Sequence, residues 1–131
     1  MPKILVVEDT MMAAEVLCMV LENLGCAADH VEDGAQALEI LCMDSEMYSL
    51  VLMDLRMPVM DGFEATRAIR KMGCVGIDGL DLPVIAVTAD ETFDTRSRCC
   101  EIGFEDFATK PLLPVTLAGL LKKYINHDVP G

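Results

Sequence analysis

The feature that most restricts the fold is the apolar run 50–53, which leads directly into Asp54 and a loop containing Pro58 and Gly62. A short apolar run bounded by turn residues is typical of a strand buried on both faces of a parallel sheet. In such sheets ligands bind where the carboxyl ends of the strands meet. A lone carboxylate there can also be a loop or helix-cap residue, so the interpretation depends on what the other strands bring to the same edge.

Strand and helix patterns alternate five times along the chain. Strand-like runs lie at 3–7, 26–31, 50–54, 83–88 and 106–109, and helical patterns at 10–24, 33–44, 62–72, 92–102 and 114–124. This alternation predicts an α/β fold with right-handed crossovers, a five-stranded parallel sheet and helices on both faces. We expect one domain over 1–131 with a core of about 3–126, and no output domain, because only 127–131 follow the last helical pattern.

The first helical pattern carries the clearest apolar stripe, and Gly25 follows it as a C-terminal cap. We expect the stripe to face the core; its members are Ala13, Val16, Leu17, Val20, Leu21 and Leu24. The helical pattern at 92–102 has the least regular spacing of apolar residues in the chain.

Charge and composition exclude several classes of function. Ten Lys and Arg residues against 22 Asp and Glu residues give a net charge of −12, which repels phosphate backbones, so we predict no nucleic-acid binding. No apolar run approaches the ~20 residues of a membrane span. The six cysteines form no CxxC pair, which argues against a disulfide framework or a zinc site and favours a reducing, cytoplasmic compartment.

Charged and hydroxyl side chains follow four of the five predicted strands at their carboxyl ends. Glu8 and Asp9 follow the first strand, Asp54 ends the third, Thr88 ends the fourth and Lys110 follows the fifth. Three carboxylates in one cleft raise each other's pKa unless a cation lies among them. Oxygen ligands suit Mg²⁺, so we predict a magnesium site with Asp9 and Asp54 as direct ligands and Glu8 acting through water.

The same residue types suit phosphoryl transfer. An aspartate can act as a nucleophile and form an aspartyl phosphate, and a metal ion with the Lys110 ammonium would neutralise the phosphoryl group. Thr88 could donate its hydroxyl to a phosphoryl oxygen. Taken singly, Thr88 could be an ordinary strand-end hydroxyl and Lys110 a solvated surface lysine, so the shared edge is the observation that favours a site.

Four segments make the sequence resemble the receiver domains of two-component response regulators and hybrid histidine kinases: 6–9, 52–62, 87–89 and 109–111. The resemblance covers about 3–126 and implies a flavodoxin-like fold with strand order 2-1-3-4-5. It implies that Asp54 accepts a phosphoryl group from a phosphohistidine, that the main-chain carbonyl of Arg56 joins Asp9 as a Mg²⁺ ligand, and that Thr88 and Lys110 bind phosphoryl oxygens. The implied partner is a histidine kinase or histidine phosphotransfer protein, and the protein is a signalling module, not an enzyme beyond its own phosphorylation and slow dephosphorylation.

The resemblance also assigns residues around the site. Phe107 matches a switch aromatic that turns inward as Thr88 moves toward the phosphate, with ordinary core packing as the alternative. The bond between Lys110 and Pro111 is expected to be cis.

Two further positions flank the implied site. Arg56 and Asp90 would tune the phosphate lifetime, and a salt bridge between them would partly shield the phosphoryl group from water. The chain departs from the commonest family pattern at Glu8, where Asp is usual, and at Phe107, where Tyr is usual.

Other functions share parts of this pattern. A binding-only pseudo-receiver would have the same fold. A haloacid-dehalogenase-like phosphatase needs a second acid two residues after its nucleophile, where this chain has Arg56. A nucleotide- or flavin-binding module needs a Gly-rich turn after the first strand, where this chain has Glu8, Asp9 and Thr10.

We expect signal output through the surface of 92–126, by a homodimer or a downstream effector. Arg96, Arg98, Lys122 and Lys123 make this the least acidic face. The phosphotransfer partner would dock against the helix at 11–24 and the loop after Thr109.

Overall fold

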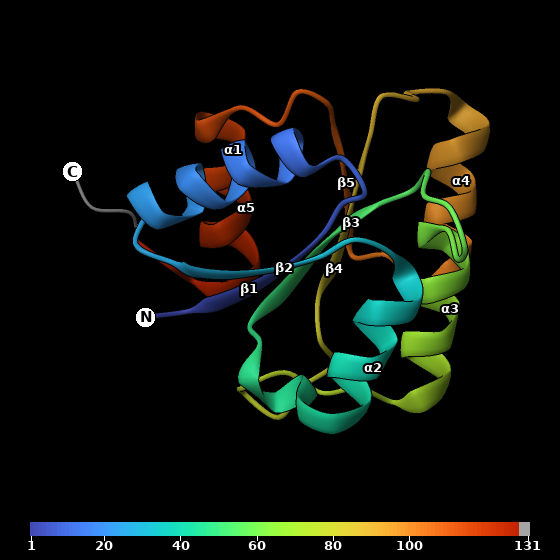
Figure 1. Cartoon of the computed structure of the whole chain (residues 1–131), viewed down its shortest axis with the longest axis horizontal. Helices are drawn as coiled ribbons and strands as arrows, with labels where there is room; N and C mark the ends of the chain where they lie inside the picture. The colour runs from blue at the N-terminus through green and yellow to red at the C-terminus, as the bar shows by residue number, and fades with distance from the viewer. Residues whose placement is uncertain (129–131) are drawn as a thin grey trace.

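The computed structural model describes residues 1–128; residues 129–131, which end the expected C-terminal tail, lie outside the described part. Within it a parallel sheet has the strand order β2-β1-β3-β4-β5 (Figure 1). The strands are β1 (Lys3–Val7), β2 (Ala27–Val31), β3 (Leu50–Asp54), β4 (Val84–Thr88) and β5 (Asp106–Thr109). The predicted α/β fold and the order 2-1-3-4-5 are confirmed, and the carboxyl ends of all strands meet at one edge.

Helices cover both faces of the sheet, as predicted. Helices α1 (Met11–Asn23) and α5 (Pro114–Ile125) pack on one face, and α2 (Gly34–Asp44), α3 (Gly62–Met72) and α4 (Phe93–Ile102) on the other (Figure 1). A short 3₁₀ helix, η1 (Ser45–Met47), follows α2. Side chains of Asp33, Asp61 and Thr92 accept hydrogen bonds from main-chain N–H groups in the first turns of α2, α3 and α4 and so fix where these helices begin.

Strand β3 is the centre of the core, and all five of its residues are buried. Leu50 and Leu52 pack with α1 and α5, whereas Val51 and Met53 pack with α2, α3 and α4. Because successive side chains of a strand point to opposite faces, both faces of β3 must be apolar when both are covered. This is why the sequence shows a continuous apolar run here instead of an alternating pattern.

The predicted apolar stripe of α1 is wrong in part. Ala14 and Leu21 are the buried residues of this helix, whereas Ala13 is exposed and Val16 is 58% exposed. The face that meets the sheet is therefore rotated from the predicted one, with the small Ala14 allowing close approach. Ala13 and Val16 instead line an open groove beside the sheet. In the described part of the chain, no helix is long and apolar enough to cross a membrane.

Candidate functional site

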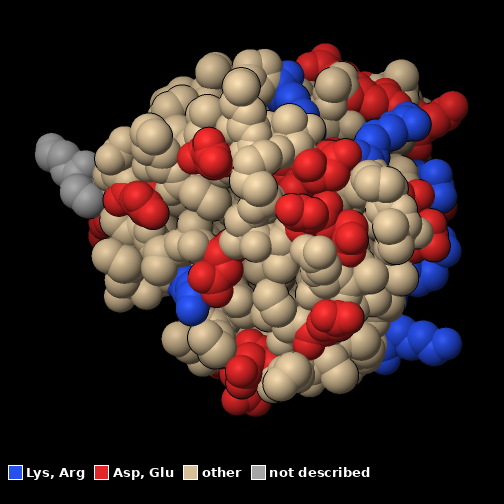
Figure 2. All heavy atoms as spheres, in the orientation of Figure 1, with Lys and Arg blue, Asp and Glu red and all other residues tan. Residues whose placement is uncertain are grey.

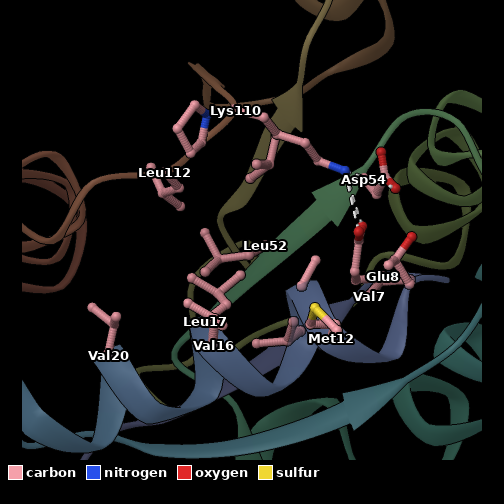
Figure 3. Close-up of a pocket in the computed structure, with 15 residues that line it drawn as sticks. Val7, Glu8, Met12, Val16, Leu17, Val20, Leu52, Asp54, Lys110 and Leu112 are labelled. Atoms are coloured by element: carbon pink, nitrogen blue, oxygen red, sulfur yellow. Dashed lines mark hydrogen bonds and ion pairs between the residues drawn. The ribbon is translucent and has the colours of Figure 1, made fainter.

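Lys110 and two buried carboxylates form the centre of the site (Figure 3). The Nζ atom of Lys110 lies 3.2 Å from Oδ2 of Asp54 and 3.2 Å from each carboxylate oxygen of Glu8. Asp54 ends β3 and Glu8 follows β1, and both are almost fully buried. One ammonium group thus reaches from the end of β5, past β4, to the carboxyl ends of β1 and β3.

Asp9 completes a cluster that could hold a metal ion. Carboxylate oxygens of Glu8, Asp9 and Asp54 lie within 4.8 Å of one another, and Asp9 is exposed to solvent while the other two are buried. A donor set made only of oxygens, with one side open to water, fits Mg²⁺, which keeps several waters and takes one or two carboxylates.

The charges in this cleft perturb one another. Burial, followed by the neighbouring Asp54 carboxylate, raises the pKa of Glu8 from 4.5 to about 7, although the Lys110 ammonium acts in the opposite direction. Burial alone would lower the pKa of Lys110, but the charges of Asp54 and Glu8 outweigh it and raise that pKa above its ordinary value. The metal-free site therefore has more negative charge than Lys110 can neutralise, as expected for a cation-binding cleft.

A chain of hydrogen bonds connects Asp54 to the start of α4. The main-chain N–H of Arg56 donates to Oδ1 of Asp54 (3.2 Å), and the Arg56 side chain donates to Oδ2 of Asp90 (3.3 Å). The N–H of Asp90 in turn donates to the hydroxyl oxygen of Thr88 (3.1 Å). Bonds from Thr92 and Thr95, with Arg56 adding to them, lower the pKa of Asp90 to about 2. The expected salt bridge between Arg56 and Asp90 is thus present at the mouth of the site.

Two main-chain features lie next to Lys110 and Asp54. The peptide bond between Lys110 and Pro111 is cis, and the N–H of Lys110 donates to the carbonyl of Thr88 (2.9 Å). At the start of α3, a Cβ on Gly62 would overlap the main-chain oxygen of Asp54. The loop after β3 can therefore fold back against the strand only because position 62 has no side chain.

Phe107 lies on β5 and is partly buried against the core that β3 shares with α3 and α4. The guanidinium carbon of Arg96 lies 4.9 Å from the centroid of the Phe107 ring, a cation–π arrangement. The Phe107 ring therefore packs against the core and also contacts Arg96 of α4. Unlike the Tyr that is usual at this position, Phe107 has no hydroxyl group that could form a hydrogen bond.

The sequence analysis missed two residues that the structure places at the site. His30, near the end of β2, contacts the main-chain oxygen of Glu8 with its Nε2 atom at 2.7 Å. Gly62 was noted only as a turn residue, and its close approach to Asp54 was not expected. A histidine in a weak strand pattern offers no local signal, whereas the glycine directly after Asp61 could have suggested a tight backbone approach.

An apolar groove of about 540 Å³ begins beside the acidic cluster. Figure 3 shows Met12, Val16 and Val20 of α1 on one side and Leu112 on the other, with Lys110 and Asp54 at the end. In Figure 2 the surface over α1 is mostly tan with separate red patches, and most of the blue side chains gather along the edge formed by α3 and α4. The site thus opens toward an apolar surface in an otherwise acidic protein.

Two much longer proteins contain stretches that are similar in sequence to this chain. Histidine protein kinase 1 of Candida albicans is 40% identical over an alignment of 126 residues, and this alignment covers 92% of this chain and 5% of that protein. Hybrid signal transduction histidine kinase B of Dictyostelium discoideum is 33% identical over an alignment of 134 residues, and this alignment covers 95% of this chain and 7% of that protein. The chain thus spans a small part of the length of either relative.

A solved structure is similar over nearly the whole fold. The receiver domain of a sensor histidine kinase from Pseudomonas aeruginosa matches with a TM-score of 0.82 and 34% identity, covering 95% of this chain and 98% of that one. That structure has a magnesium ion coordinated in its active-site cleft. The family model of the response regulator receiver domain matches residues 4–122. With the acidic cluster and the sheet order already described, these matches show that the chain belongs to the response regulator receiver domains, the signalling modules of two-component phosphorelays.

Proposed function

We propose that this receiver domain takes a phosphoryl group from a phosphohistidine onto Asp54 in a Mg²⁺-dependent reaction. The observation that carries the proposal is the position of Lys110, whose ammonium lies 3.2 Å from Oδ2 of Asp54 beside three clustered carboxylates. A buried carboxylate beside a lysine and beside further carboxylates that could hold a cation is arranged to accept a dianionic group.

Each residue of the site would have a separate role in the reaction. A carboxylate oxygen of Asp54 attacks phosphorus while the P–N bond breaks, and the leaving imidazole keeps the electron pair and takes up a proton from water. The ammonium of Lys110 and the hydroxyl of Thr88 hold phosphoryl oxygens. Glu8, Asp9, Asp54 and the main-chain carbonyl of Arg56 would hold Mg²⁺. When bound, the ion supplies positive charge that offsets the phosphoryl group.

The direct test is the intact mass after incubation with Mg²⁺ and acetyl phosphate. The wild type should gain one phosphoryl mass, and Asp54→Asn should not. Asp128→Asn is the matched control, because this aspartate is 85% exposed and pairs with Lys122 on the surface. A wild type that stays unmodified with both acetyl phosphate and a phosphohistidine donor would contradict the proposal and favour a binding-only pseudo-receiver.

The alternative of a haloacid-dehalogenase-like phosphatase finds no support in the geometry. Such a phosphatase needs a general acid two residues after the nucleophile, and this position is Arg56. The Arg56 side chain is 75% exposed and points to Asp90. Slow hydrolysis of added phosphate esters by Asp54 would reopen this alternative.

For the partner, we expect a helix carrying the phosphohistidine to dock in the apolar groove between α1 and the loop after β5. The groove runs from Val20 to the reacting carboxylate of Asp54, so a bound helix could present its histidine to the site. Val16→Asp should slow transfer from a phosphotransfer protein by about tenfold or more, because docking would bury an unpaired charge. Met43→Asp is the control on the opposite side of the sheet, since Met43 is 83% exposed on α2. Labelling by acetyl phosphate should be unchanged in both variants.

For the output, we expect the surface of 92–126 to change when Asp54 is phosphorylated, and to bind a second copy or an effector. The contact between Arg96 and Phe107 supports this, because an inward turn of the ring would release Arg96 on the surface of α4. Sedimentation of the phosphorylated protein with and without Arg96→Ala tests whether this face mediates dimerisation. If phosphorylation does not change the association state, we expect a separate effector protein to bind this surface.

A further inference from the structure

We propose that His30 is a positioning residue for the acidic pair: it holds the peptide between Glu8 and Asp9 and thereby sets the affinity of the site for Mg²⁺. The inference rests on the proposed function of the same site. His30 belongs to β2, at the edge of the sheet, and does not itself belong to the acidic cluster.

Strand β2 holds the main chain of Glu8 at both of its polar groups. Nε2 of His30 lies 2.7 Å from the carbonyl oxygen of Glu8. A carbonyl can only accept, so Nε2 carries the proton and donates. On the other side of the residue, the N–H of Glu8 donates to the carbonyl of Val31 (3.1 Å). The second of these bonds would form with any residue type in β2, whereas the first needs the side chain of His30.

The His30 bond acts where the chain has few other restraints. Strand β1 ends at Val7 and α1 begins at Met11, and the N-cap residue Thr10 makes no side-chain capping bond. In the described part of the chain, the Asp9 side chain is exposed and has no hydrogen-bond or ion-pair partner. Within this connection His30 is the side chain that fixes the main chain next to Asp9.

The peptide plane transmits this restraint to the metal ligand. The carbonyl of Glu8 and the N–H of Asp9 belong to one planar unit, so holding the carbonyl also fixes the direction in which the chain enters Asp9. Residues that orient metal ligands from behind commonly change metal affinity by about 10- to 100-fold when they are lost. Without His30 the peptide could rotate, and Asp9 would have to be ordered at the moment when the ion binds.

The test compares two substitutions that differ in the donor. His30→Leu places an apolar side chain on β2 that cannot donate a hydrogen bond, and should weaken Mg²⁺ binding by about tenfold. His30→Gln carries an amide N–H in place of Nε2–H and should restore most of the affinity. His127→Leu is the matched control, because Nε2 of His127 makes the same contact with the carbonyl of Leu24 at 2.7 Å, at the far end of α1. This control should bind Mg²⁺ as the wild type does.

Two measurements on the full chain separate positioning from general damage. Calorimetric titration with Mg²⁺ alone gives the affinity, and labelling with acetyl phosphate over a range of Mg²⁺ gives both the half-saturating concentration and the maximal rate. We expect His30→Leu to raise the half-saturating concentration about tenfold and to leave the maximal rate near that of the wild type.

The outcomes distinguish this inference from the proposed function. If the wild type binds Mg²⁺ and becomes labelled while His30→Leu binds equally well, the role of His30 is refuted and the function stands. Equal losses in His30→Leu and His30→Gln would also refute it, because the donor would then be irrelevant. A wild type that neither binds Mg²⁺ nor accepts phosphate would overturn both.

Discussion

Replacing Glu8 with glutamine should stabilise the metal-free protein at neutral pH. Burial and the neighbouring Asp54 raise the pKa of Glu8 from 4.5 to about 7, so between these values the folded state binds more protons than the unfolded chain. Stability therefore decreases as pH rises from about 4.5, and the loss is complete above about 7. Glutamine keeps the shape of the side chain without the charge and removes this penalty.

The size of the effect follows from the same two pKa values. At about 1.4 kcal/mol for each pH unit between them, the full penalty above pH 7 would be about 3 kcal/mol. Glu8 lies at the inner end of a cleft that opens to water, where solvent screens part of the interaction, so we expect about 1–2 kcal/mol. The loss of the ion pair with Lys110 is already included, because Lys110 contributes to the pKa of Glu8.

Urea denaturation in EDTA, followed by circular dichroism, measures the difference in unfolding free energy between the variant and the wild type. This difference should be near zero at about pH 4 and should favour the variant by about 1–2 kcal/mol at about pH 8. Glu15→Gln on the exposed side of α1 is the control and should show no such trend. Added Mg²⁺ should stabilise the wild type more than the variant. A variant that is less stable at about pH 8 in EDTA would refute the reasoning, because the pair with Lys110 would then dominate.

Arg56→Ala should shorten the half-life of the aspartyl phosphate, measured as the loss of the phosphoryl mass over time. The unfolding free energy should change by less than about 0.5 kcal/mol, because the ion pair between Arg56 and Asp90 lies at the surface. An unchanged half-life would exclude shielding by this salt bridge. Gly62→Ala should lower the unfolding free energy by more than about 2 kcal/mol because its Cβ would overlap the main chain of Asp54. The control Gly119→Ala, in α5 with open space around it, should raise the unfolding free energy by about 0.5–1 kcal/mol, and similar urea midpoints for the two variants would contradict this account. Because the pKa of Asp90 is lowered to about 2, its stabilising contribution is present above pH 4 and is lost as pH falls toward 2, so Asp90→Asn should flatten the acid limb of a pH titration of stability. An acid limb that is identical in the two proteins would show that Asp90 makes no such contribution.

The order of the elements and the edge that carries the site could be predicted from the sequence, because both follow from local patterns. Alternating strand and helix patterns imply parallel strands, and parallel strands bring their carboxyl ends together. The burial of α1 could not be predicted in the same way. Ala13 and Ala14 are equally small and apolar, and only the groove beside α1 decides that Ala14 is buried and Ala13 is open.

Side-chain contacts between residues far apart in the sequence could not be predicted from sequence patterns either. That Lys110 would meet Glu8 as well as Asp54 depends on side-chain length and on the spacing of three strands. The contact of His30 with Glu8 depends on the register between β1 and β2, in which His30 lies opposite Val6. Neither the register between β1 and β2 nor the rotamer of Lys110 could be predicted from this one sequence.

The ion pair between Lys110 and Glu8 joins residues 102 positions apart, and Asp54 comes from the middle of the chain between them. No contiguous piece of the protein holds these three groups together, so the cleft exists only while strands β1, β3 and β5 are assembled. Labelling by acetyl phosphate would therefore count folded molecules chemically. In a mixture of variants, the labelled fraction at equal Mg²⁺ would rank their folding without any spectroscopic signal, which is useful for a chain that has no tryptophan.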